Sequence, residues 1–402
     1  MTTAERLTRA TSQVAAPLVV VDLERFDANA ADLRRRAGGV PIRVASKSVR
    51  VRALISRALD AGFQGVMAYS LPEASWLAGS GVQDVLVGYP TADRAALAEL
   101  VADERARSEI TLMIDDVAHV ELVSAALATA GRGAPDVAVC IDVDASLRLR
   151  VGPASVHLGT RRSPLHSPDD VARLARRVSQ TDGLRLRGLM FYEAQIAGLP
   201  DTSPAVRAVK RLSIRELQAR RGAVLAAVRA AVGHDVELVN SGGTGSLESS
   251  SAAPGVTEVT AGSGLYVPGA FDRYRAFRPR PAAFFGVDVV RVPGPRWATT
   301  FGGGYVASGP AGRSRLPSVL TPGWDMTRRE GVGEVQTPLR RRGRGAASGT
   351  GTDGSLRVGD RVWFRHAKAG ELMEHVDRVH LVRGDEVVDV VPTYRGEHRA
   401  FG

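Results

Sequence analysis

The sequence predicts an α/β protein in which a (β/α)8 barrel of the TIM type is followed by a β domain. Between residues 42 and 264, eight short apolar, β-branched runs alternate with amphipathic helical stretches, as parallel βαβ units require. Eight units are the number of a closed barrel, although an open, doubly wound sheet accepts the same alternation. From about residue 275 the chain changes to strands separated by turn signals, which predicts the separate β domain.

The barrel strands are expected at 42–47, 65–70, 84–90, 110–116, 137–144, 187–194, 236–243 and 256–264. Helical stretches such as DRAALAELVADERAR and SIRELQARRGAVLAAVRAAVG separate them. An earlier strand at 17–22 is expected to join the β domain. We therefore divide the chain into an N-terminal strand segment (1–25), a barrel (26–272) and a β domain (273–402). Within the last, the stretch 339–355 is rich in Gly, Ser and Arg and predicts a flexible basic loop.

Charge and cysteine content argue against several classes of function. The formal net charge is +10, but most arginines are scattered between apolar positions of helical stretches, so nucleic acid is not an expected partner. Cys140 is the only cysteine, which excludes a disulfide within the chain and favours a reducing compartment. The N-terminal stretch has neither a signal-peptide pattern nor a membrane span, and we expect a cytoplasmic protein without a membrane partner.

Lysine is rare in this chain, which draws attention to Lys47. Only three of the 53 basic residues are lysine, at positions 47, 210 and 368. Arginine keeps its proton in proteins, whereas a lysine amine can become neutral and attack a carbonyl. Lys47 ends the first predicted barrel strand, and catalytic residues of this architecture lie where strands end. It is therefore a candidate for covalent chemistry, the alternative being a strand-end lysine whose stem covers apolar surface.

Two glycine-rich segments follow the last two predicted barrel strands, NSGGTGSLESS at 240–250 and TAGSGLYVPGAFD at 260–272. Glycine lets the backbone approach an anion closely, and successive amides can form an anion-binding nest. In (β/α)8 barrels the phosphate site is commonly built from these two last loops. Together with a lysine at the end of strand one, such a cradle suggests pyridoxal 5'-phosphate (PLP) held as a Schiff base.

At these motifs the chain resembles the alanine racemase-type (fold type III) PLP proteins. It is most similar to their D-threonine aldolase and D-serine dehydratase branch, which includes an amino-acid deaminase/aldolase group. The similarity runs nearly end to end, and its most specific segments are RVASKSVR, FYEAQIAG, NSGGTGS, AGSGLYVPGAFD and FRHAKAGEL.

The resemblance implies roles for individual residues. Lys47 would carry the cofactor, and Tyr192 would line its ring or the substrate side. For the cation that faces the ring or its phenolic oxygen, Arg148 is the best match and His157 the alternative. Tyr266 would contact the phosphate or pack beside the ring. The phosphate itself would be held by amides and hydroxyls of Ser241, Gly242, Gly243, Thr244, Gly262, Ser263 and Gly264.

The chain departs from this branch at its histidines and at its metal pair. The branch has histidines two residues on either side of its lysine, where this chain has Ala45 and Val49. The branch also has a His-x-Cys or His-x-Asp pair in the β domain that binds a divalent ion. This chain has His366 and Lys368 there, and Gln336 stands where relatives tend to have a further histidine. An ammonium is a poor metal ligand, so the metal pair is incomplete.

This departure suggests a hypothesis for the β-domain residues. The Lys368 ammonium would supply the positive charge of the missing metal, and His366 would transfer protons, since a developing alkoxide or leaving hydroxide needs stabilisation. In a second interpretation, the two merely occupy neighbouring strand positions. In a third, His366 binds a metal after all, with Glu371 and His375 as the replacement ligands.

The resemblance implies a lyase that acts on a small D-3-hydroxy amino acid. We rank a D-threonine aldolase-like retro-aldol cleavage to glycine and an aldehyde first, and a D-serine dehydratase-like deamination second. An alanine racemase-like activity ranks third, because it needs a tyrosine on the second face of Cα, for which Tyr394 is a candidate. A PLP carrier without turnover is least favoured, because single-domain carriers of this fold lack a β domain. Relatives of two-domain type usually form homodimers, so a homodimer is expected.

Overall fold

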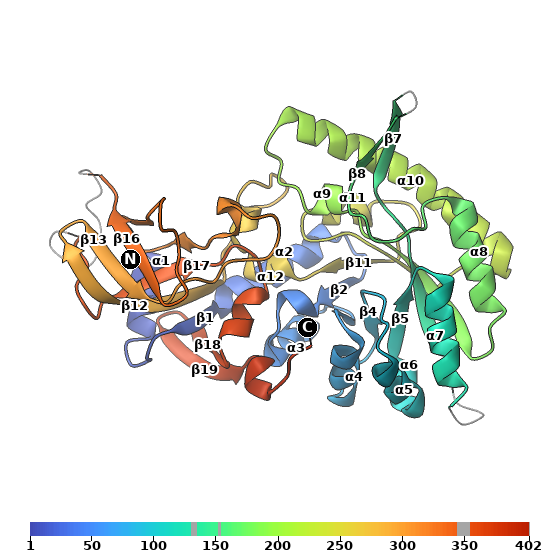
Figure 1. Cartoon of the computed structure of the whole chain (residues 1–402), viewed down its shortest axis with the longest axis horizontal. Helices are drawn as coiled ribbons and strands as arrows, with labels where there is room; N and C mark the ends of the chain where they lie inside the picture. Colours follow the sequence, from blue (N-terminus) through green and yellow to red (C-terminus); the bar gives the residue numbers. More distant parts are fainter. Residues whose placement is uncertain (130–134, 152–153, 344–353, 402) are drawn as a thin grey trace.

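Eight parallel strands close into a barrel in the computed structural model of the chain, which describes residues 1–129, 135–151, 154–343 and 354–401 (Figure 1). Around the barrel the strands follow the order β10-β11-β2-β3-β4-β5-β6-β9. Each predicted strand is present, which confirms the (β/α)8 fold and excludes the open sheet. Their bounds are β2 (Ile42–Ala45), β3 (Val66–Ala68), β4 (Val85–Val87), β5 (Ile110–Ile114), β6 (Val137–Asp142), β9 (Leu184–Phe191), β10 (Leu238–Ser241) and β11 (Glu258–Ala261).

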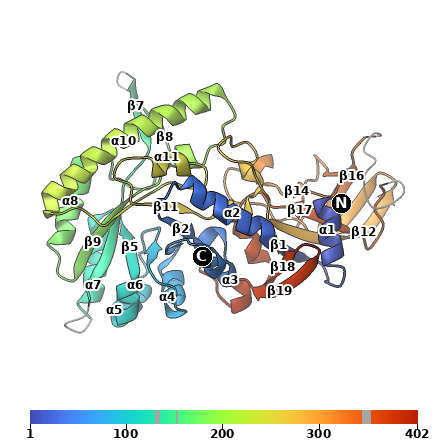
Figure 2. The ribbon, with the colours of Figure 1, turned by 180° about the vertical axis from the view of Figure 1, so that it is seen from behind.

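Helices surround the barrel on its outer side (Figures 1 and 2). They are α2 (Leu23–Arg36), α3 (Arg52–Asp60), α4 (Leu71–Gly79), α5 (Arg94–Ala102), α6 (Glu104–Glu109), α7 (Val117–Leu127), α8 (Pro168–Ser179) and α10 (Pro204–Val232). Short helices α9 (Ala194–Ala197), α11 (Leu247–Ser251) and α12 (Ser263–Tyr266) lie in the loops after β9, β10 and β11. Capping side chains fix where helices begin. Ser70 accepts a hydrogen bond from the N–H of Glu73, and Ser203 caps α10, which begins with Pro204 and ends before Gly233 at φ +86°.

The barrel interior is packed in layers. An apolar layer consists of Leu86, Met113, Cys140, Met190 and Leu238, with Met67 against it. A polar network contains Arg43, which is fully buried and pairs with Glu258 and Asp84 at 2.7 Å each. Because both carboxylates satisfy the guanidinium, the buried charge is tolerated. The centre of the barrel is therefore closed, and any site must lie at a rim.

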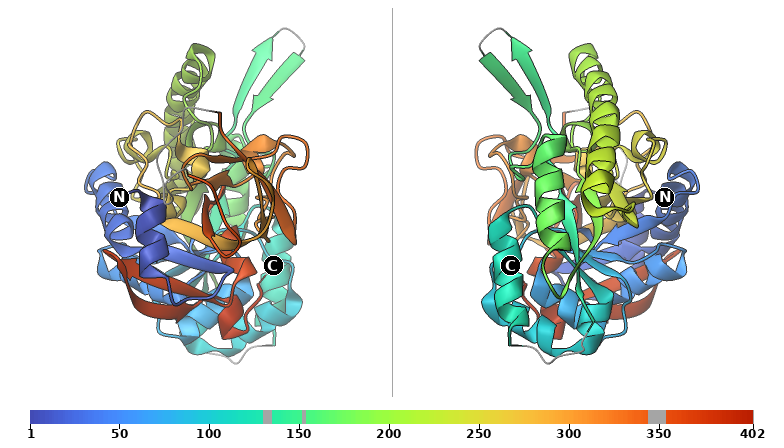
Figure 3. Two further views of the ribbon diagram at one scale, coloured as in Figure 1. Left: turned by 90° about the vertical axis from the view of Figure 1, so that its left-hand side faces the viewer. Right: turned by 90° about the vertical axis from the view of Figure 1, so that its right-hand side faces the viewer.

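A β-hairpin is inserted between β6 and β9. Its strands, β7 (Leu147–Val151) and β8 (Ala154–Leu158), are antiparallel, and among the described residues they pair only with each other. Figure 3 shows the hairpin projecting from the barrel beside the long helix α10, which contacts β7. The sequence analysis placed no strands here.

The second layer of the molecule is a nine-stranded sheet with the path β15-β16-β13-β12-β1-β18-β19 and a branch in which β17 pairs with β12 and β14. Its strands are β1 (Leu18–Asp22), β12 (Ala283–Gly294), β13 (Trp297–Phe301), β14 (Ser318–Val319), β15 (Trp324–Met326), β16 (Gln336–Arg341), β17 (Arg361–Arg365), β18 (Arg378–Arg383) and β19 (Glu386–Pro392). Strand β1 lies between β12 and β18, and α1 (Thr3–Ala10) packs against the same sheet. A β domain beside the barrel is thereby confirmed.

Two details concern the predicted boundaries. Helix α2 begins at Leu23 and contacts both β18 and α12, so the division at residue 25 stays a prediction. The predicted flexible loop 339–355 is wrong at its start, where residues 339–341 belong to β16 and pair with β13. Residues 344–353 of that stretch lie outside the described residues. None of the described helices has the length and apolar character needed to cross a membrane.

Candidate active site

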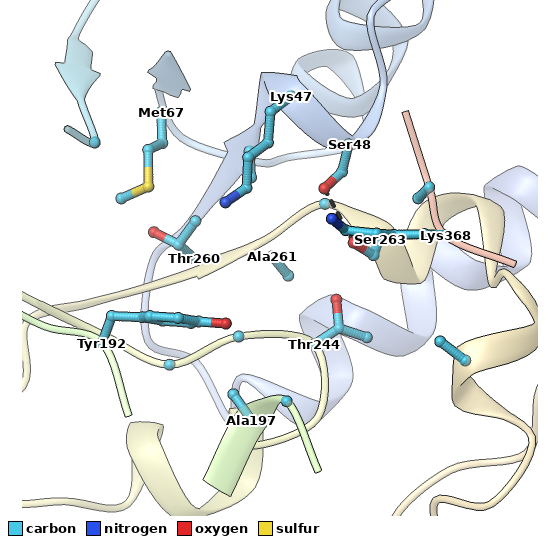
Figure 4. A pocket seen from close by; sticks show the side chains of 18 of the residues that line it. Lys47, Ser48, Met67, Tyr192, Ala197, Thr244, Thr260, Ala261, Ser263 and Lys368 are labelled. Atoms are coloured by element: carbon cyan, nitrogen blue, oxygen red, sulfur yellow. Dashed lines mark hydrogen bonds between the residues drawn. The ribbon is translucent and has the colours of Figure 1, made fainter. Parts of the chain in front are cut away.

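A cavity of about 250 Å³ lies at the carboxyl ends of the barrel strands, where the β domain covers the barrel. The loops after β2, β4, β8, β9, β10 and β11 line it, together with Met67 of β3 and two β-domain loops that carry Arg315 and Lys368. Of the predicted site residues, the structure brings together Lys47, Tyr192, Gly242, Gly243, Thr244, Gly262, Ser263 and Lys368. In Figure 4 the Lys47 side chain points into the cavity, with Tyr192 across from it and Thr244, Ser263 and Ser48 to one side.

Lys47 lies in a short 3-10 turn, Ser46–Ser48, directly after β2. The turn is held on both sides, because the Ser46 hydroxyl donates to the carbonyl of Met67 at 3.0 Å and Ser48 shares a 3.0 Å hydrogen bond with Ser263. The Lys47 ammonium donates a hydrogen bond to the hydroxyl of Tyr89, the residue that follows Gly88 after β4. The lysine is thus held at the rim with its nitrogen inside the cavity.

The glycine loops approach their neighbours too closely for side chains. A Cβ at Gly262 would stand 2.6 Å from the carbonyl oxygen of Ala45, and one at Gly243 would stand 3.0 Å from the Cβ of Ala197. Within the loops, the N–H of Gly264 donates to the Thr244 hydroxyl at 3.0 Å. In the described part of the chain, the N–H groups of Thr244, Gly262 and Ser263 have no such partner. These amides, with the Ser263 and Ser48 hydroxyls, fit a phosphate group.

Three predicted phosphate residues lie behind the cavity wall rather than on it. The Ser241 hydroxyl accepts a hydrogen bond from the buried Arg221 guanidinium at 3.0 Å, and the Gly264 backbone packs against Leu33. Tyr266 is fully buried and donates from its hydroxyl to the carbonyl of Val49 at 3.0 Å. These residues support the loops that line the cavity, so a direct contact of theirs with a ligand is not favoured.

Glu193 is a residue that the sequence analysis did not single out. It is 2% exposed and accepts four hydrogen bonds from the loop after β10, through both carboxylate oxygens. The donors are the Gly242 N–H at 3.0 Å and the hydroxyls of Ser241 (3.1 Å), Ser246 (3.2 Å) and Ser250. This carboxylate therefore fixes the shape of the glycine loop from behind.

Aromatic rings and cations form the wall on the Lys47 side. The guanidinium of Arg162 lies 5.1 Å from the centre of the Tyr192 ring and 5.7 Å from that of Tyr89. Burial raises the pKa of Tyr192. For Tyr89, burial alone would raise the pKa, but the Lys47 ammonium, with Arg162 and Lys368, lowers it below its ordinary value.

The β domain contributes Lys368 to the cavity wall. Its ammonium donates to the Ser308 hydroxyl at 2.6 Å and pairs with Glu371 at 2.8 Å. Glu371 also accepts from the N–H of Ser308 at 2.7 Å. Burial alone would raise the pKa of Glu371, but these hydrogen bonds and the Lys368 charge lower it. Lys368 is thus held as a cation at the mouth of the cavity.

His366 does not line this cavity. Its ring is 3% exposed and lies edge-on to Tyr266, with ring centres 6.3 Å apart. Burial and the charge of Arg365 lower the pKa of His366 to about 3. Since its ring lies outside the cavity and resists protonation, a proton-transfer role for His366 is not favoured by its position.

The side chains around His366 do not form a site for a divalent metal ion either. His366, Glu371 and His375 line a second cavity of only about 10 Å³, together with Lys368. Glu371 is committed to Lys368 and Ser308, and the His375 ring stacks on Tyr305 at 4.4 Å. Among the described residues, no three or more His, Cys, Asp or Glu side chains are arranged to hold a metal ion.

The structure does not bring Arg148, His157 or Tyr394 to the cavity. Arg148 and His157 face each other across the projecting hairpin, where Arg148 pairs with Asp144 at 2.6 Å. Arg162, beyond the hairpin, is the cation that reaches the cavity instead. Tyr394 is 1% exposed and packs edge-on against Trp76, so its hydroxyl is not available to a second subunit.

Some of the site residues that were not identified from the sequence stand at positions that could have revealed them. Tyr89 lies at the end of the third predicted barrel strand (84–90), the kind of position that singled out Lys47. Glu193 lies within the FYEAQIAG segment. Arg162 and the β-domain residue Arg315 had no such signal, because loops bring them to the cavity.

Comparisons with known proteins agree with this geometry. The family model described as "Alanine racemase, N-terminal domain" matches residues 21–268. A D-threonine aldolase of Arthrobacter sp. is 25% identical over 260 residues, which are 64% of this chain and 62% of that protein. A D-threo-3-hydroxyaspartate dehydratase of Delftia sp. (strain HT23) is 32% identical over 251 residues, 61% of this chain and 60% of that protein. The matched part thus spans about three fifths of these relatives.

The fold similarity extends further along the chain. The crystal structure of D-threonine aldolase from Filomicrobium marinum superimposes with a TM-score of 0.77 and covers 96% of each chain at 22% identity. At this identity the likeness concerns the fold, and it includes the β domain as well as the barrel.

Proposed function

Because the chain belongs to the alanine racemase N-terminal domain family, we propose that it is a PLP-dependent lyase acting on a small D-3-hydroxy amino acid. Its first-ranked reaction is retro-aldol cleavage to glycine and an aldehyde, as in D-threonine aldolase. The observation that carries this proposal is the placement of Lys47. Its amine lies in the cavity of about 250 Å³ that Thr244, Gly262 and Ser263 also line.

Each side chain of the proposed site has a separate role. Lys47 would attach the cofactor, the glycine loops and their hydroxyls would hold its phosphate, and Tyr192 would line the side of its ring. Arg162, which lines the cavity where Arg148 does not, would be the cation on that side. When bound, PLP supplies an electron sink for the bond that breaks at Cα. The protein selects that bond by fixing its orientation with respect to the ring.

Lys368 stabilises the oxygen at Cβ. In the aldol reaction, the β-hydroxyl gives its proton to a base, and negative charge develops on that oxygen. The Cα–Cβ bond then breaks, its electron pair stays with the Cα fragment, and the oxygen becomes that of the aldehyde. A fixed ammonium near this position lowers the energy of that state. Because the donors around His366 do not fit a divalent ion, no step is assigned to a metal.

Deamination is the second candidate, and the 32% identical D-threo-3-hydroxyaspartate dehydratase favours it. In that reaction Cα loses a proton and hydroxide leaves Cβ, and water then hydrolyses the resulting enamine, through its imine form, to a keto acid and ammonia. A racemase ranks below both, since Tyr394 is buried within its own chain. A homodimer and a cytoplasmic location stay predictions, and light scattering of the purified protein tests the first.

The first experiment is an absorbance spectrum of the purified protein with PLP, before and after borohydride. We expect a band that borohydride abolishes, and a cofactor that stays covalently bound at Lys47 in peptide mass spectra. Lys47→Ala and Lys47→Arg should both lose it, and the second keeps the positive charge. Product assays with D-threonine, D-serine and alanine then separate the three activities. A protein that takes up no PLP would refute the proposal.

A further inference from the structure

Tyr89 occupies a position next to the reactive amine that the proposed function leaves without a role. It follows β4 through Gly88, whose N–H donates to the carbonyl of Ala68 at 2.8 Å. A Cβ at Gly88 would stand 2.9 Å from Cγ of Met67, so glycine is needed for the close approach of the two strand ends. This turn brings the half-buried Tyr89 to Lys47, whose ammonium donates to the Tyr89 hydroxyl.

The charges around Tyr89 are of one sign. The Lys47 ammonium lies 5.0 Å from the centre of the Tyr89 ring, and the Arg162 guanidinium lies 5.7 Å from it. Lys368 approaches from the β domain, and Tyr192 is the neutral neighbour across Arg162. In the described part of the chain, the cavity lining contains four basic residues, Lys47, Arg162, Arg315 and Lys368, and no Asp or Glu.

This arrangement stabilises an anion on the Tyr89 oxygen. Burial alone would raise the pKa of Tyr89, but the three nearby cations and the hydrogen bond from Lys47 lower it. For Tyr192, which has Arg162 but no hydrogen-bonded lysine, burial prevails and the pKa is raised. Tyr89 is therefore the side chain at the cavity that is suited to accept a proton at moderately alkaline pH.

We propose that Tyr89 is a catalytic residue that takes the proton from Lys47 and so prepares the amine for attack. One N–H bond of the Lys47 ammonium breaks, an O–H bond forms on the Tyr89 phenolate, and the nitrogen keeps the electron pair. That pair then forms the bond to an aldehyde carbon. This inference rests on the proposed function for its aldehyde, but the proton transfer itself requires no cofactor.

The test uses the cofactor-free protein, in which the reaction rate of each lysine can be measured separately. Formaldehyde with cyanoborohydride methylates neutral amines, and peptide mass spectrometry reports the rate at each of the three lysines. In Tyr89→Phe we expect methylation of Lys47 to fall at least about tenfold near pH 8 relative to wild type, since general bases contribute about 10² to 10⁴ in rate. The rate at Lys210, which pairs with Asp201 and is not part of the cavity lining, is the internal reference. Tyr305→Phe, a ring of the β domain outside the cavity lining, is the matched control.

A spectroscopic readout accompanies the labelling. Ultraviolet difference titration should show one tyrosine of the wild type ionising below the ordinary value of about 10, and this component should be missing from Tyr89→Phe and kept in Tyr305→Phe. Unchanged Lys47 labelling together with an unchanged titration would overturn the inference. If both change as expected but no protein takes up PLP, the proton transfer stands and the proposed function fails. Thermal unfolding of Tyr89→Phe near the wild-type temperature excludes a folding defect.

Discussion

The carbonyl oxygen of Lys47 lies so close to Gly370 that a Cβ at position 370 would stand 1.9 Å from it. Gly370 has φ +86°, a region that glycine occupies without strain, and it belongs to the β-domain loop that also carries Lys368. The β domain therefore packs directly on the backbone of the reactive lysine. The position of the Lys47 amine depends on a segment more than three hundred residues further along the chain.

Gly370→Ala should consequently disturb both stability and cofactor attachment. The backbone at 370 must move away from Lys47, and we expect a loss of several kcal/mol in the free energy of unfolding, of the order known for severe steric changes. Gly359→Ala is the control, because residue 359 has a similar φ of +92° and a Cβ there would have no other atom within 4 Å. It should cost only about 1–2 kcal/mol, the strain of an L side chain in a left-handed conformation. Urea unfolding and borohydride trapping measure the two effects, and equal losses in both variants would contradict this argument.

The barrel could be predicted because its strands leave a regular pattern. Each of the eight buried runs ends within a few residues of the expected position, and helical stretches separate them. The β7–β8 hairpin could not be predicted in this way. In the part of the chain that the structure describes, its ten strand residues pair only with each other, and nothing in a single sequence shows that LRLRV and ASVHL fold back on themselves. Arg148 and His157 were therefore assigned to a site from which the hairpin removes them.

The site was predictable where a residue follows a barrel strand directly. Lys47, Tyr192 and Gly243 reach the cavity because the barrel fixes where strands end. The β-domain contribution depends on how the sheet packs on the barrel, so His366 and Lys368 could be identified as neighbours but not placed. The structure separates them. Lys368 faces the cavity, whereas His366 faces Tyr266.

Glu193→Gln should loosen the glycine loop. The amide would present an NH2 group to donors that now share a carboxylate, so at least one hydrogen bond from Gly242, Ser246 or Ser250 is lost. Hydrogen bonds to charged groups contribute about 1.5–3 kcal/mol each, so we expect a loss of about 2 kcal/mol in stability and at least tenfold weaker PLP binding.

Glu237→Gln is the control for that substitution. Its side chain is 64% exposed and pairs with Arg185 at the surface, where an ion pair contributes at most about 1 kcal/mol. Fluorescence titration with PLP and urea unfolding provide both readouts. Wild-type PLP affinity in Glu193→Gln would show that the carboxylate does not support the loop.

Lys368→Met should separate cofactor attachment from turnover. The borohydride-sensitive band is expected to remain, because Lys47 and the glycine loops are untouched. Cleavage of the favoured D-3-hydroxy amino acid should fall by about 10² to 10³, the effect of removing one group that stabilises a developing oxyanion. Lys368→Arg, which keeps the charge, should retain part of the activity. Elemental analysis of the active wild type is the second readout, and a stoichiometric divalent ion bound through His366 would contradict the role of Lys368.

Asp142, at the end of β6, should make stability depend on pH. Burial and the nearby Asp115 charge raise the pKa of Asp142 to about 7, although Arg162 opposes them. Because this pKa lies above the ordinary value of about 4, the carboxyl favours folding at low pH, and that contribution is lost as the pH rises through about 7.

Asp142→Asn removes this ionisation while preserving the size of the side chain. Relative to wild type, its free energy of unfolding should therefore increase between pH 5 and pH 8, by on the order of 2 kcal/mol. Asp115→Asn removes the charge that raises the Asp142 pKa, so it should reduce the pH dependence without abolishing it. Urea unfolding of the three proteins at both pH values measures these differences. The same pH dependence in Asp142→Asn as in wild type would show that another group is responsible.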